Sequence, residues 1–285
     1  MELDEQPIYL KDKKRRKTMN KKEYANDVIR ILNDEGYENV RIVESLKENG
    51  VVKVGVALKG NGNMETIMYI ENTNTNPREM AEEIKKMKKD NMEMDWLTKE
   101  YLLENVLEEL LNKEKNLEKN IIKKDEENGL VKAFYIDTPI ENGYMRVTDS
   151  MCEYLNVTRN KLYENARKNT ENKEADVIDL GRYMEKMIGL PEGAMGITGT
   201  YVVTNKEKVK GAVMILNTKV QNRLSEELGE YYVLPSSRHE VIVVPKGDNE
   251  YLRNMVREVN SKEVSEEDFL SNDVYEVKEG RLVEV

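Results

Sequence analysis

Several residue types are scarce in this sequence, and each shortage excludes a class of protein. A single cysteine, Cys152, rules out an intramolecular disulfide and indicates a reducing compartment. We interpret Cys152 as a small packed hydrophobic residue rather than a reactive thiol. No apolar run approaches the ~18 residues of a membrane-spanning helix, and the charged start is unlike a signal peptide. We therefore expect a cytoplasmic protein without membrane association.

Histidine and the larger aromatic residues are also rare. One histidine and one cysteine are too few for a zinc site, so we expect no metal and no cofactor. A magnesium site made of carboxylates alone stays open, because the chain has 55 Asp and Glu. Two Phe and one Trp leave the core to Ile, Leu, Val, Met and Tyr.

Charge, by contrast, is abundant, and its balance limits the partners. Charged residues make up 35% of the chain, and the net charge of -10 argues against a general nucleic-acid binder. Residues 1–18 are interpreted as a basic extension, because Lys11 to Lys22 holds eight Lys or Arg in twelve residues. We expect at most a weak nucleic-acid contact there, through phosphates and without sequence preference.

The order of apolar patterns predicts an α+β fold of antiparallel sheets with packed helices. We expect an N-terminal α+β subdomain over residues 19–120 and a C-terminal α+β domain over residues 121–285. In the subdomain the patterns predict a helix from Met19, strands at 40–43, 51–58 and 65–70, a helix from Pro77, and a longer helix over 96–111. The charge-rich residues 112–128 are the predicted boundary.

The second domain is predicted to contain a β-β-α-β-β core. After strands at 129–136 and 144–147 and two short helices, we expect a helix over 177–187. The core comprises strands at 201–204 and 212–216, a helix ending at Gly229, and strands at 231–234 and 241–244. A final helix around Leu252 to Val256 precedes a tail.

Two segments resemble ligand-binding motifs without meeting their requirements. Residues 151–166 have the spacing of a helix-turn-helix, with Arg159 and Lys161 as candidate binding residues at the start of the second helix. An ordinary helical hairpin is the favoured interpretation, because the domain is acidic and the turn lacks glycine. The glycine-rich residues 193–199 lead into a strand rather than a helix, which argues against a phosphate loop.

The sole histidine lies at a polar corner between two predicted strands. Pro235 ends the first strand, and Ser236, Ser237, Arg238, His239 and Glu240 follow. A hydrolase would use Ser236 or Ser237 as nucleophile and His239 as base, oriented by a carboxylate such as Asp273 or a partner's Glu240. The favoured interpretation is structural, with these side chains satisfying loop backbone groups. Arg238, His239 and Glu240 are the binding candidates if the corner contacts a partner.

The second half of the chain resembles a known family. The segments that carry the resemblance are Leu162 to Thr170, Tyr201 to Asn205, the Leu-Pro-Ser-Ser-x-His-Glu motif at 234–240, Asn254 to Asn260 and Ser265 to Tyr275. Together they resemble a domain-of-unknown-function family of gut Gram-positive bacteria and their mobile elements. Arg238 departs from the aliphatic residue expected between the serines and the histidine. The resemblance implies a fold and a genomic context but no mechanism.

This context makes protein binding the leading hypothesis. Mobile elements often carry acidic proteins that bind host defence proteins, so we expect an unidentified host protein partner and an anti-defence role. The acids alternate with Lys and Arg, which favours a specific interface over imitation of DNA. A hydrolase using Ser236 or Ser237 with His239 and a DNA-binding accessory protein are the alternatives. Whether the protein is an enzyme stays open, and the residues at the corner lean against it.

Overall fold

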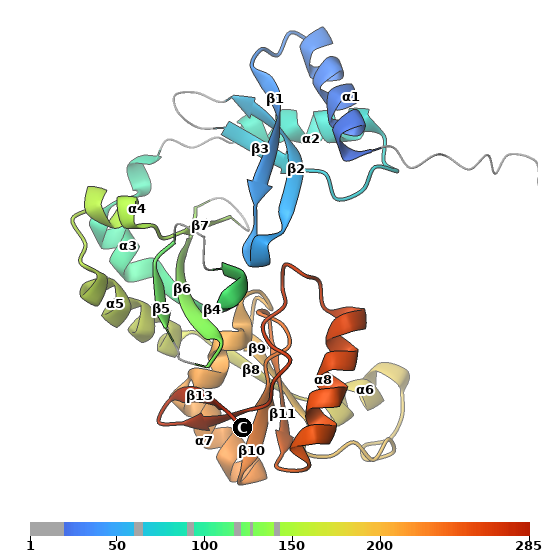
Figure 1. Ribbon diagram of the computed structural model, residues 1–285, viewed down its shortest axis with the longest axis vertical. Helices are drawn as coiled ribbons and strands as arrows, with labels where there is room; N and C mark the ends of the chain where they lie inside the picture. The colour runs from blue at the N-terminus through green and yellow to red at the C-terminus, as the bar shows by residue number, and fades with distance from the viewer. Residues whose placement is uncertain (1–19, 60–64, 90–93, 117–120, 126–127, 140–142) are drawn as a thin grey trace, which may run out of the picture. The chain divides into compact units, whose positions relative to one another are not determined.

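The computed structural model describes residues 20–59, 65–89, 94–116, 121–125, 128–139 and 143–285 (Figure 1). The basic extension predicted for residues 1–18 lies outside these residues. The chain divides into two compact units, of which the first comprises the residues up to Lys47 together with Val52–Glu93. The second comprises the short loop Glu48–Val51 together with Met94–Val285. Helices and antiparallel sheets occur in both units, so the predicted α+β class is confirmed.

In the first unit, two helices pack on an antiparallel sheet. The elements are α1 (Lys21–Asp34), β1 (Val40–Leu46), β2 (Val52–Lys59), β3 (Glu65–Tyr69) and α2 (Pro77–Lys89). The strand order is β1-β2-β3. Asn20 caps α1 in a reciprocal arrangement with Glu23, which satisfies backbone N–H groups at the helix start. The buried face of α1, with Tyr24, Val28 and Leu32, meets β2 and α2 in one core.

The second unit begins with a sheet built around a buried strand. Its elements are α3 (Lys99–Asn105), β4 (Val106–Asn112), β5 (Lys123–Asp125), β6 (Leu130–Asp137), β7 (Tyr144–Arg146), α4 (Asp149–Tyr154) and α5 (Arg159–Asn172). The order β4-β6-β5 is antiparallel, and β7 also pairs with β6. Thr148 and Thr158 cap α4 and α5, and Cys152 is buried in the core between them, as predicted.

The predicted helix over 96–111 is wrong beyond Asn105. Val106 begins β4, which pairs residue by residue with β6 from Val106–Ile136 to Asn112–Leu130. In the sequence, Glu108 and Glu109 resemble the exposed face of a helix, but in the structure they are 2% and 0% exposed. The same pairing explains why no boundary falls at 120/121, because β4 is hydrogen-bonded to β6 across it; the two units divide after Glu93 instead.

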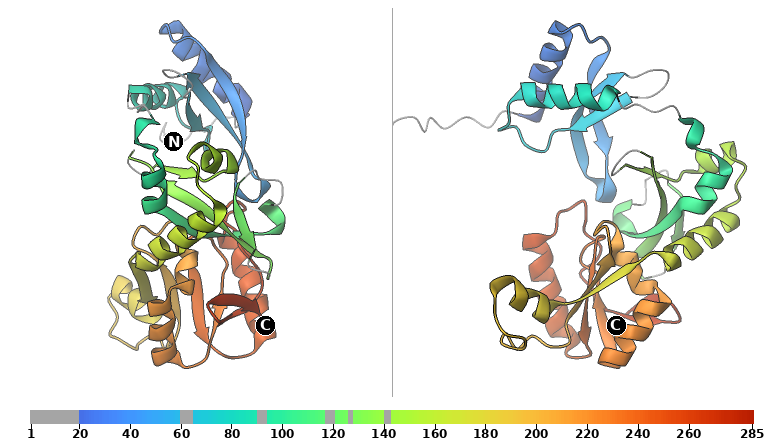
Figure 2. Two further views of the ribbon diagram at one scale, coloured as in Figure 1. Left: turned by 90° about the vertical axis from the view of Figure 1, so that its left-hand side faces the viewer. Right: turned by 180° about the vertical axis from the view of Figure 1, so that it is seen from behind.

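A second sheet forms the C-terminal part of this unit. Its elements are β8 (Ala175–Asp179), α6 (Leu180–Ile188), β9 (Tyr201–Asn205), α7 (Thr218–Leu228), β10 (Tyr231–Leu234), β11 (Val241–Pro245), α8 (Asn249–Glu263), β12 (Tyr275–Lys278) and β13 (Arg281–Glu284). The strand order is β13-β12-β10-β11-β9-β8. Helices α7 and α8 lie on opposite faces of this sheet (Figure 1 and, from behind, Figure 2). Successive residues Tyr231 to Leu234 are therefore all buried, each against one helix layer.

Three further expectations for this sheet are corrected. Residues 175–179 form a strand, and the predicted helix over 177–187 starts only at Leu180, after the N-cap Asp179. Residues 212–216 were predicted as a strand in the β-β-α-β-β core, but they belong to a buried 3₁₀ helix over Gly211–Leu216. The prediction is wrong because the periodicity of a continuous apolar run does not distinguish a strand from a helix. The expected tail contains β12 and β13. Within the described ranges, no helix is long and apolar enough to cross a membrane.

Candidate functional site

The corner after β10 is held by backbone bonds to the loop that follows α8. The amide of Leu270 donates to the carbonyl of Ser236 at 3.0 Å, and the amide of Arg238 donates to the carbonyl of Asp268 at 2.8 Å. An isolated β-bridge joins Ser237 to Phe269. Residues 235–238 and 268–271 therefore act as a short ladder, which fixes the positions of both segments.

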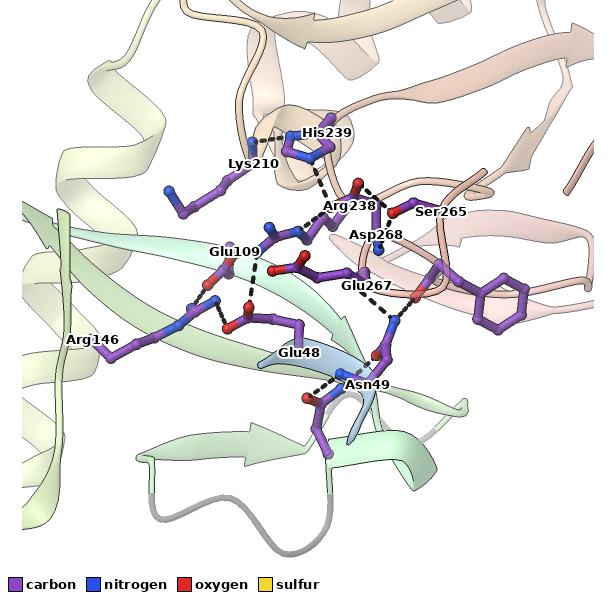
Figure 3. A network of polar contacts seen from close by, with 12 residues as sticks. Glu48, Asn49, Glu109, Arg146, Lys210, Arg238, His239, Ser265, Glu267 and Asp268 are labelled. Atoms are coloured by element: carbon purple, nitrogen blue, oxygen red, sulfur yellow. Dashed lines mark hydrogen bonds and ion pairs between the residues drawn. The ribbon is translucent and has the colours of Figure 1, made fainter. Parts of the chain in front are cut away.

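The imidazole of His239 has both ring nitrogens engaged (Figure 3). The backbone N–H of Lys210 lies 3.1 Å from Nδ1, and because an amide nitrogen can only donate, Nδ1 is the acceptor. The ring proton is thereby assigned to Nε2, which donates to Asp268 Oδ1 at 2.9 Å. This ring is a bridge between two segments, with neither nitrogen left to take a proton from a nucleophile.

The carboxylate of Asp268 is the centre of the corner. It accepts from Arg238 Nε at 2.8 Å, from His239 Nε2 at 2.9 Å and from Ser265 Oγ at 2.7 Å. These donors, with the His239 bond the largest contribution, hold the pKa of Asp268 far below its usual range. The group is therefore ionised at every physiological pH and compensates the buried Arg238 guanidinium.

A cluster of buried charges lies next to this corner. Arg238 is 7% exposed, and its Nη1 lies 3.8 Å from Glu48 and 3.7 Å from Glu109. Arg146 donates to Glu48 at 2.9 Å and also contacts Glu109 (Figure 3). Removing one member of such a cluster leaves an uncompensated buried charge, which typically costs about 3–5 kcal/mol.

The loop that supplies Glu48 is fixed by its neighbour Asn49. Asn49 has φ 57°, a left-handed conformation that asparagine tolerates better than most residues. Its side-chain amide donates to the carbonyls of Glu266 at 2.8 Å and Phe269 at 2.7 Å, and its oxygen accepts from Asn116 at 2.8 Å. The loop 265–269 therefore contacts Asn49 on one side and the His239 corner on the other.

Lys210 completes the cluster as a buried cation among aromatic rings. It is 3% exposed, and its Nζ lies 3.2 Å from the ring centroid of Tyr144 and 4.7 Å from that of Tyr135. Burial, followed by repulsion from Arg146 and Arg238, lowers the pKa of Lys210 to about 8. Lys210 is therefore a mixture of charged and neutral forms close to physiological pH.

Gly211 is required by the close approach of three segments beside Lys210. A Cβ at position 211 would lie 2.3 Å from Thr204 Oγ1 and 2.7 Å from the carbonyl oxygen of His239. Thr204 Oγ1 donates to that same carbonyl at 2.7 Å. Any larger residue at 211 would therefore separate β9 from the His239 corner.

The predicted site residues are only partly brought together. Ser236 and Ser237 are buried beside His239, but among the described residues the contacts of its ring are Lys210 and Asp268 rather than a serine hydroxyl. The hydroxyl of Ser237 instead accepts from the His239 backbone N–H at 3.1 Å. The predicted carboxylate Asp273 does not orient His239, because it contacts Ser271 instead. The carboxylate that binds the ring is Asp268, which was not predicted.

The other binding candidates lie apart from this network. Glu240 is partly exposed after the corner. Arg159 and Lys161 are exposed at the start of α5, where Arg159 forms an ion pair with Asp149 at 2.6 Å. Sequence reasoning missed Asp268 and Lys210, although Asp268 falls within the Ser265–Tyr275 segment that carried the family resemblance.

Backbone amides of the glycine-rich segment 193–199 bind a carboxylate of the protein itself. The buried carboxylate of Glu185 accepts from the amide of Gly193 at 2.8 Å and from the amide of Met195 at 2.9 Å. A Cβ at Gly181 would lie 2.2 Å from the carbonyl oxygen of Ile197, so a glycine lets this loop approach α6. The backbone nest that a phosphate would need is therefore occupied.

Comparisons with known proteins place the chain in a family without assigning an activity. A family model described as "Family of unknown function (DUF5688)" matches residues 20–278, which extends the resemblance over the first half of the chain. No curated protein and no solved structure matches the chain. Among the described residues, no group of three or more His, Cys, Asp or Glu side chains is arranged to hold a metal ion.

Proposed function

We propose that this chain, which belongs to the family of unknown function DUF5688, binds a partner protein. Membership of that family assigns no activity, so the proposal is argued from the surface and the site. The observation that carries this proposal is helix α6, which exposes large apolar side chains and buries a glutamate. Its buried residues are Gly181 and Glu185, whereas four of its large apolar side chains are exposed: Tyr183, Met184, Met187 and Ile188. Helices of globular proteins bury their apolar stripe instead, so this outward face needs a separate explanation.

The apolar face of α6 is continuous along the helix and the turn after it. Met187 is 70% exposed and Ile188 63%, where a core helix would bury both. The exposed apolar members of this face are Tyr183, Met184, Met187, Ile188 and Leu190. Contiguous exposed apolar patches that exceed the size usual for monomers mark interaction sites on protein surfaces. The two methionines add a polarizable, adaptable contact surface.

The shape and charge of this face indicate the kind of partner. The apolar residues follow helical spacing, which fits the ridges of a second helix packed against α6. One cation borders this face without a partner: Lys186 is exposed, and among the described residues its side chain has no ion-pair partner. We therefore infer a protein partner that presents an apolar helix face bordered by Asp or Glu.

The His239 corner supports this function as a rigid element rather than as a catalytic centre. A hydrolase needs a histidine nitrogen within reach of its nucleophile, and both nitrogens of His239 are bonded to Lys210 and Asp268. This geometry favours the binding hypothesis over the hydrolase alternative. An anti-defence role for this protein, through binding of a host defence protein, is a further proposal that rests only on the mobile-element context implied by the resemblance.

Quantitative binding tests the proposal. A partner captured with the full chain would be purified, and its affinity measured for wild type, Met187→Glu and Tyr154→Glu. We expect Met187→Glu to weaken binding at least tenfold, because it places a charge in the apolar face. The control Tyr154→Glu should change affinity less than twofold, since Tyr154 is 84% exposed on another helix.

Two results would contradict the inferred partner. Equal affinities for all three proteins would show that α6 is not the interface. If sedimentation shows a self-associated chain that Met187→Glu disperses, the α6 face binds a second copy instead of a different protein.

A further inference from the structure

The side-chain amine of Lys210 is buried without a polar partner. Lys210 lies directly before the 3₁₀ helix Gly211–Leu216 and is 3% exposed. Among the described residues, its Nζ has no hydrogen bond and no ion pair, and it lies against the rings of Tyr144 and Tyr135. Figure 3 shows that this amine points away from His239, which contacts the Lys210 backbone instead. Buried polar groups are usually hydrogen-bonded, so the unpaired amine needs an explanation.

The amine of Lys210 nevertheless keeps contact with solvent. The described side-chain atoms that are both sealed from solvent and unpaired include Arg146 Nη1 and Arg238 Nη1, but Lys210 Nζ is not one of them. The ring of Tyr144, 3.2 Å below the amine, belongs to the surface, since this residue is 42% exposed. A small molecule can therefore reach Nζ beside Tyr144, whereas the low exposure of Lys210 as a whole excludes a bulky one.

The backbone of Lys210 is held in a conformation that fixes the position of this amine. Its φ of 58° and ψ of 26° are left-handed, a region that lysine rarely adopts. The turn before it is clamped by Asn205, whose side chain bonds both the amide and the carbonyl of Val209. The amide of Lys210 itself donates to His239. Strained residues that their surroundings hold in this way are concentrated at functional sites, which marks Lys210 as a candidate.

The charges around Lys210 favour the neutral, nucleophilic form of its amine. Burial, followed by repulsion from Arg146 and Arg238, lowers the pKa of Lys210 to about 8, although Asp137 and Glu48 oppose this shift. Desolvation and adjacent cations are the two ways in which proteins activate lysine toward carbonyl compounds. The surroundings of Lys210 combine both.

The same surroundings favour a product that carries a positive charge. The polar cluster beside Lys210 contains three carboxylates and two guanidinium groups: Glu48, Glu109, Asp268, Arg146 and Arg238. Lys210 is the third cation of this cluster. An acyl or carbamoyl group on Nζ would remove that charge and leave a carboxylate uncompensated. A protonated imine retains the charge, and the two tyrosine rings stabilise a cation at this position.

We propose that Lys210 forms a reversible imine with small, uncharged aldehydes, at a site separate from the α6 face. The lone pair of the neutral Nζ attacks the carbonyl carbon to give a carbinolamine, which loses water as the C=N bond forms. Uptake of one proton then gives the iminium ion and restores the charge of the cluster. An aldehyde fits better than a ketone, because its carbonyl carbon carries only one substituent past Tyr144.

Reductive trapping of the full chain with propionaldehyde tests the proposal. A pulse of borohydride reduces the imine to a stable secondary amine, which peptide mass spectrometry measures at each lysine. Two lysines of the same chain are controls: Lys186 is exposed, and Lys132 is 5% exposed but lies 3.7 Å from Glu108. Intact mass is also compared between wild type and Lys210→Arg, which keeps the positive charge but has no nucleophilic amine.

We expect Lys210 to be labelled at least tenfold faster than Lys186 at pH 7.5. About a quarter of an amine with a pKa of about 8 is neutral at that pH, against about 0.1% of a lysine with the usual pKa of about 10.4. Lys132 should stay unlabelled, and the fast phase should be absent from Lys210→Arg. Glyoxylate, an aldehyde that carries a carboxylate, should label Lys210 at least tenfold more slowly than propionaldehyde.

Four results would overturn the proposal. Labelling of Lys210 no faster than that of Lys186 would show that the site does not activate the amine. A fast phase that persists in Lys210→Arg would place the reaction elsewhere. Equal labelling of Lys210 and Lys132 would mean that Nζ reacts only after the fold opens. Faster labelling by glyoxylate would refute the preference for uncharged aldehydes.

Discussion

Replacement of His239 separates a structural role from a catalytic one. His239→Phe keeps a planar ring of similar size and removes both hydrogen bonds of the imidazole. The buried backbone N–H of Lys210 then loses its acceptor at Nδ1, and Asp268 loses one of its donors. A general base, by contrast, can be replaced with little effect on folding.

The structure sets the size of the expected loss. An unsatisfied buried donor costs about 1–3 kcal/mol, and a hydrogen bond to a charged group contributes about 1.5–3 kcal/mol. The imidazole is about one quarter exposed, which places both effects at the lower end of these ranges. We expect His239→Phe to lower the free energy of unfolding by about 2–4 kcal/mol. His239→Gln, which retains an amide donor and acceptor, should cost about 1–3 kcal/mol.

Urea unfolding followed by tryptophan fluorescence is the assay. Trp96 is the sole tryptophan of the sequence and packs against Tyr101 in the second unit, so its emission reports on the unit that holds the corner. Glu240→Gln is the matched control, at a partly exposed neighbour, and should change stability by less than about 0.5 kcal/mol. A His239→Phe protein that unfolds at the wild-type urea concentration would refute the structural role.

Three other predictions concern Lys210, Glu185 and the N-terminal extension. The pKa of Lys210 in the folded protein, about 8, is below its value in the unfolded chain, so above pH 8 the unfolded chain binds more protons than the folded one. The free energy of unfolding should therefore rise from pH 8 to 9.5. In urea unfolding, Lys210→Met should abolish that rise. Glu185→Ala removes the acceptor of two loop amides, and hydrogen exchange at Gly193 and Met195 should accelerate at least tenfold if the carboxylate holds the loop. Deletion of residues 1–18 should shift Tm by less than about 3 °C and abolish any salt-sensitive nucleic-acid binding; a larger shift would show that the extension is packed.

Local sequence signals determined many of the elements. Asn20, Thr158 and Asp248 cap helices through their own side chains, which is a property of short-range chemistry. Pro235 ends β10 because proline cannot donate to a strand ladder. The strands on either side of the His239 corner, and the α+β class itself, follow from apolar patterns of a few residues.

Tertiary structure decided the elements whose sequence favours another form. Val106 to Leu111 has a helical pattern, yet pairing with β6 and burial of Glu108 and Glu109 against cations make it a strand. Residues 211–216 are apolar throughout, and only the layers on both sides of the run determine that it is a 3₁₀ helix.

Part of the candidate site is determined by the sequence and part only by the tertiary structure. The sequence by itself singled out Ser236, Ser237, Arg238 and His239, because the only histidine and the proline that ends the strand lie within a few residues of one another. Its partners are not visible: Asp268 is 29 residues away and Lys210 is another 29 in the opposite direction. No local rule links such positions, since backbone pairing between distant loops brings them together. The role of His239 as a bridge rather than a base was therefore decided by the tertiary structure.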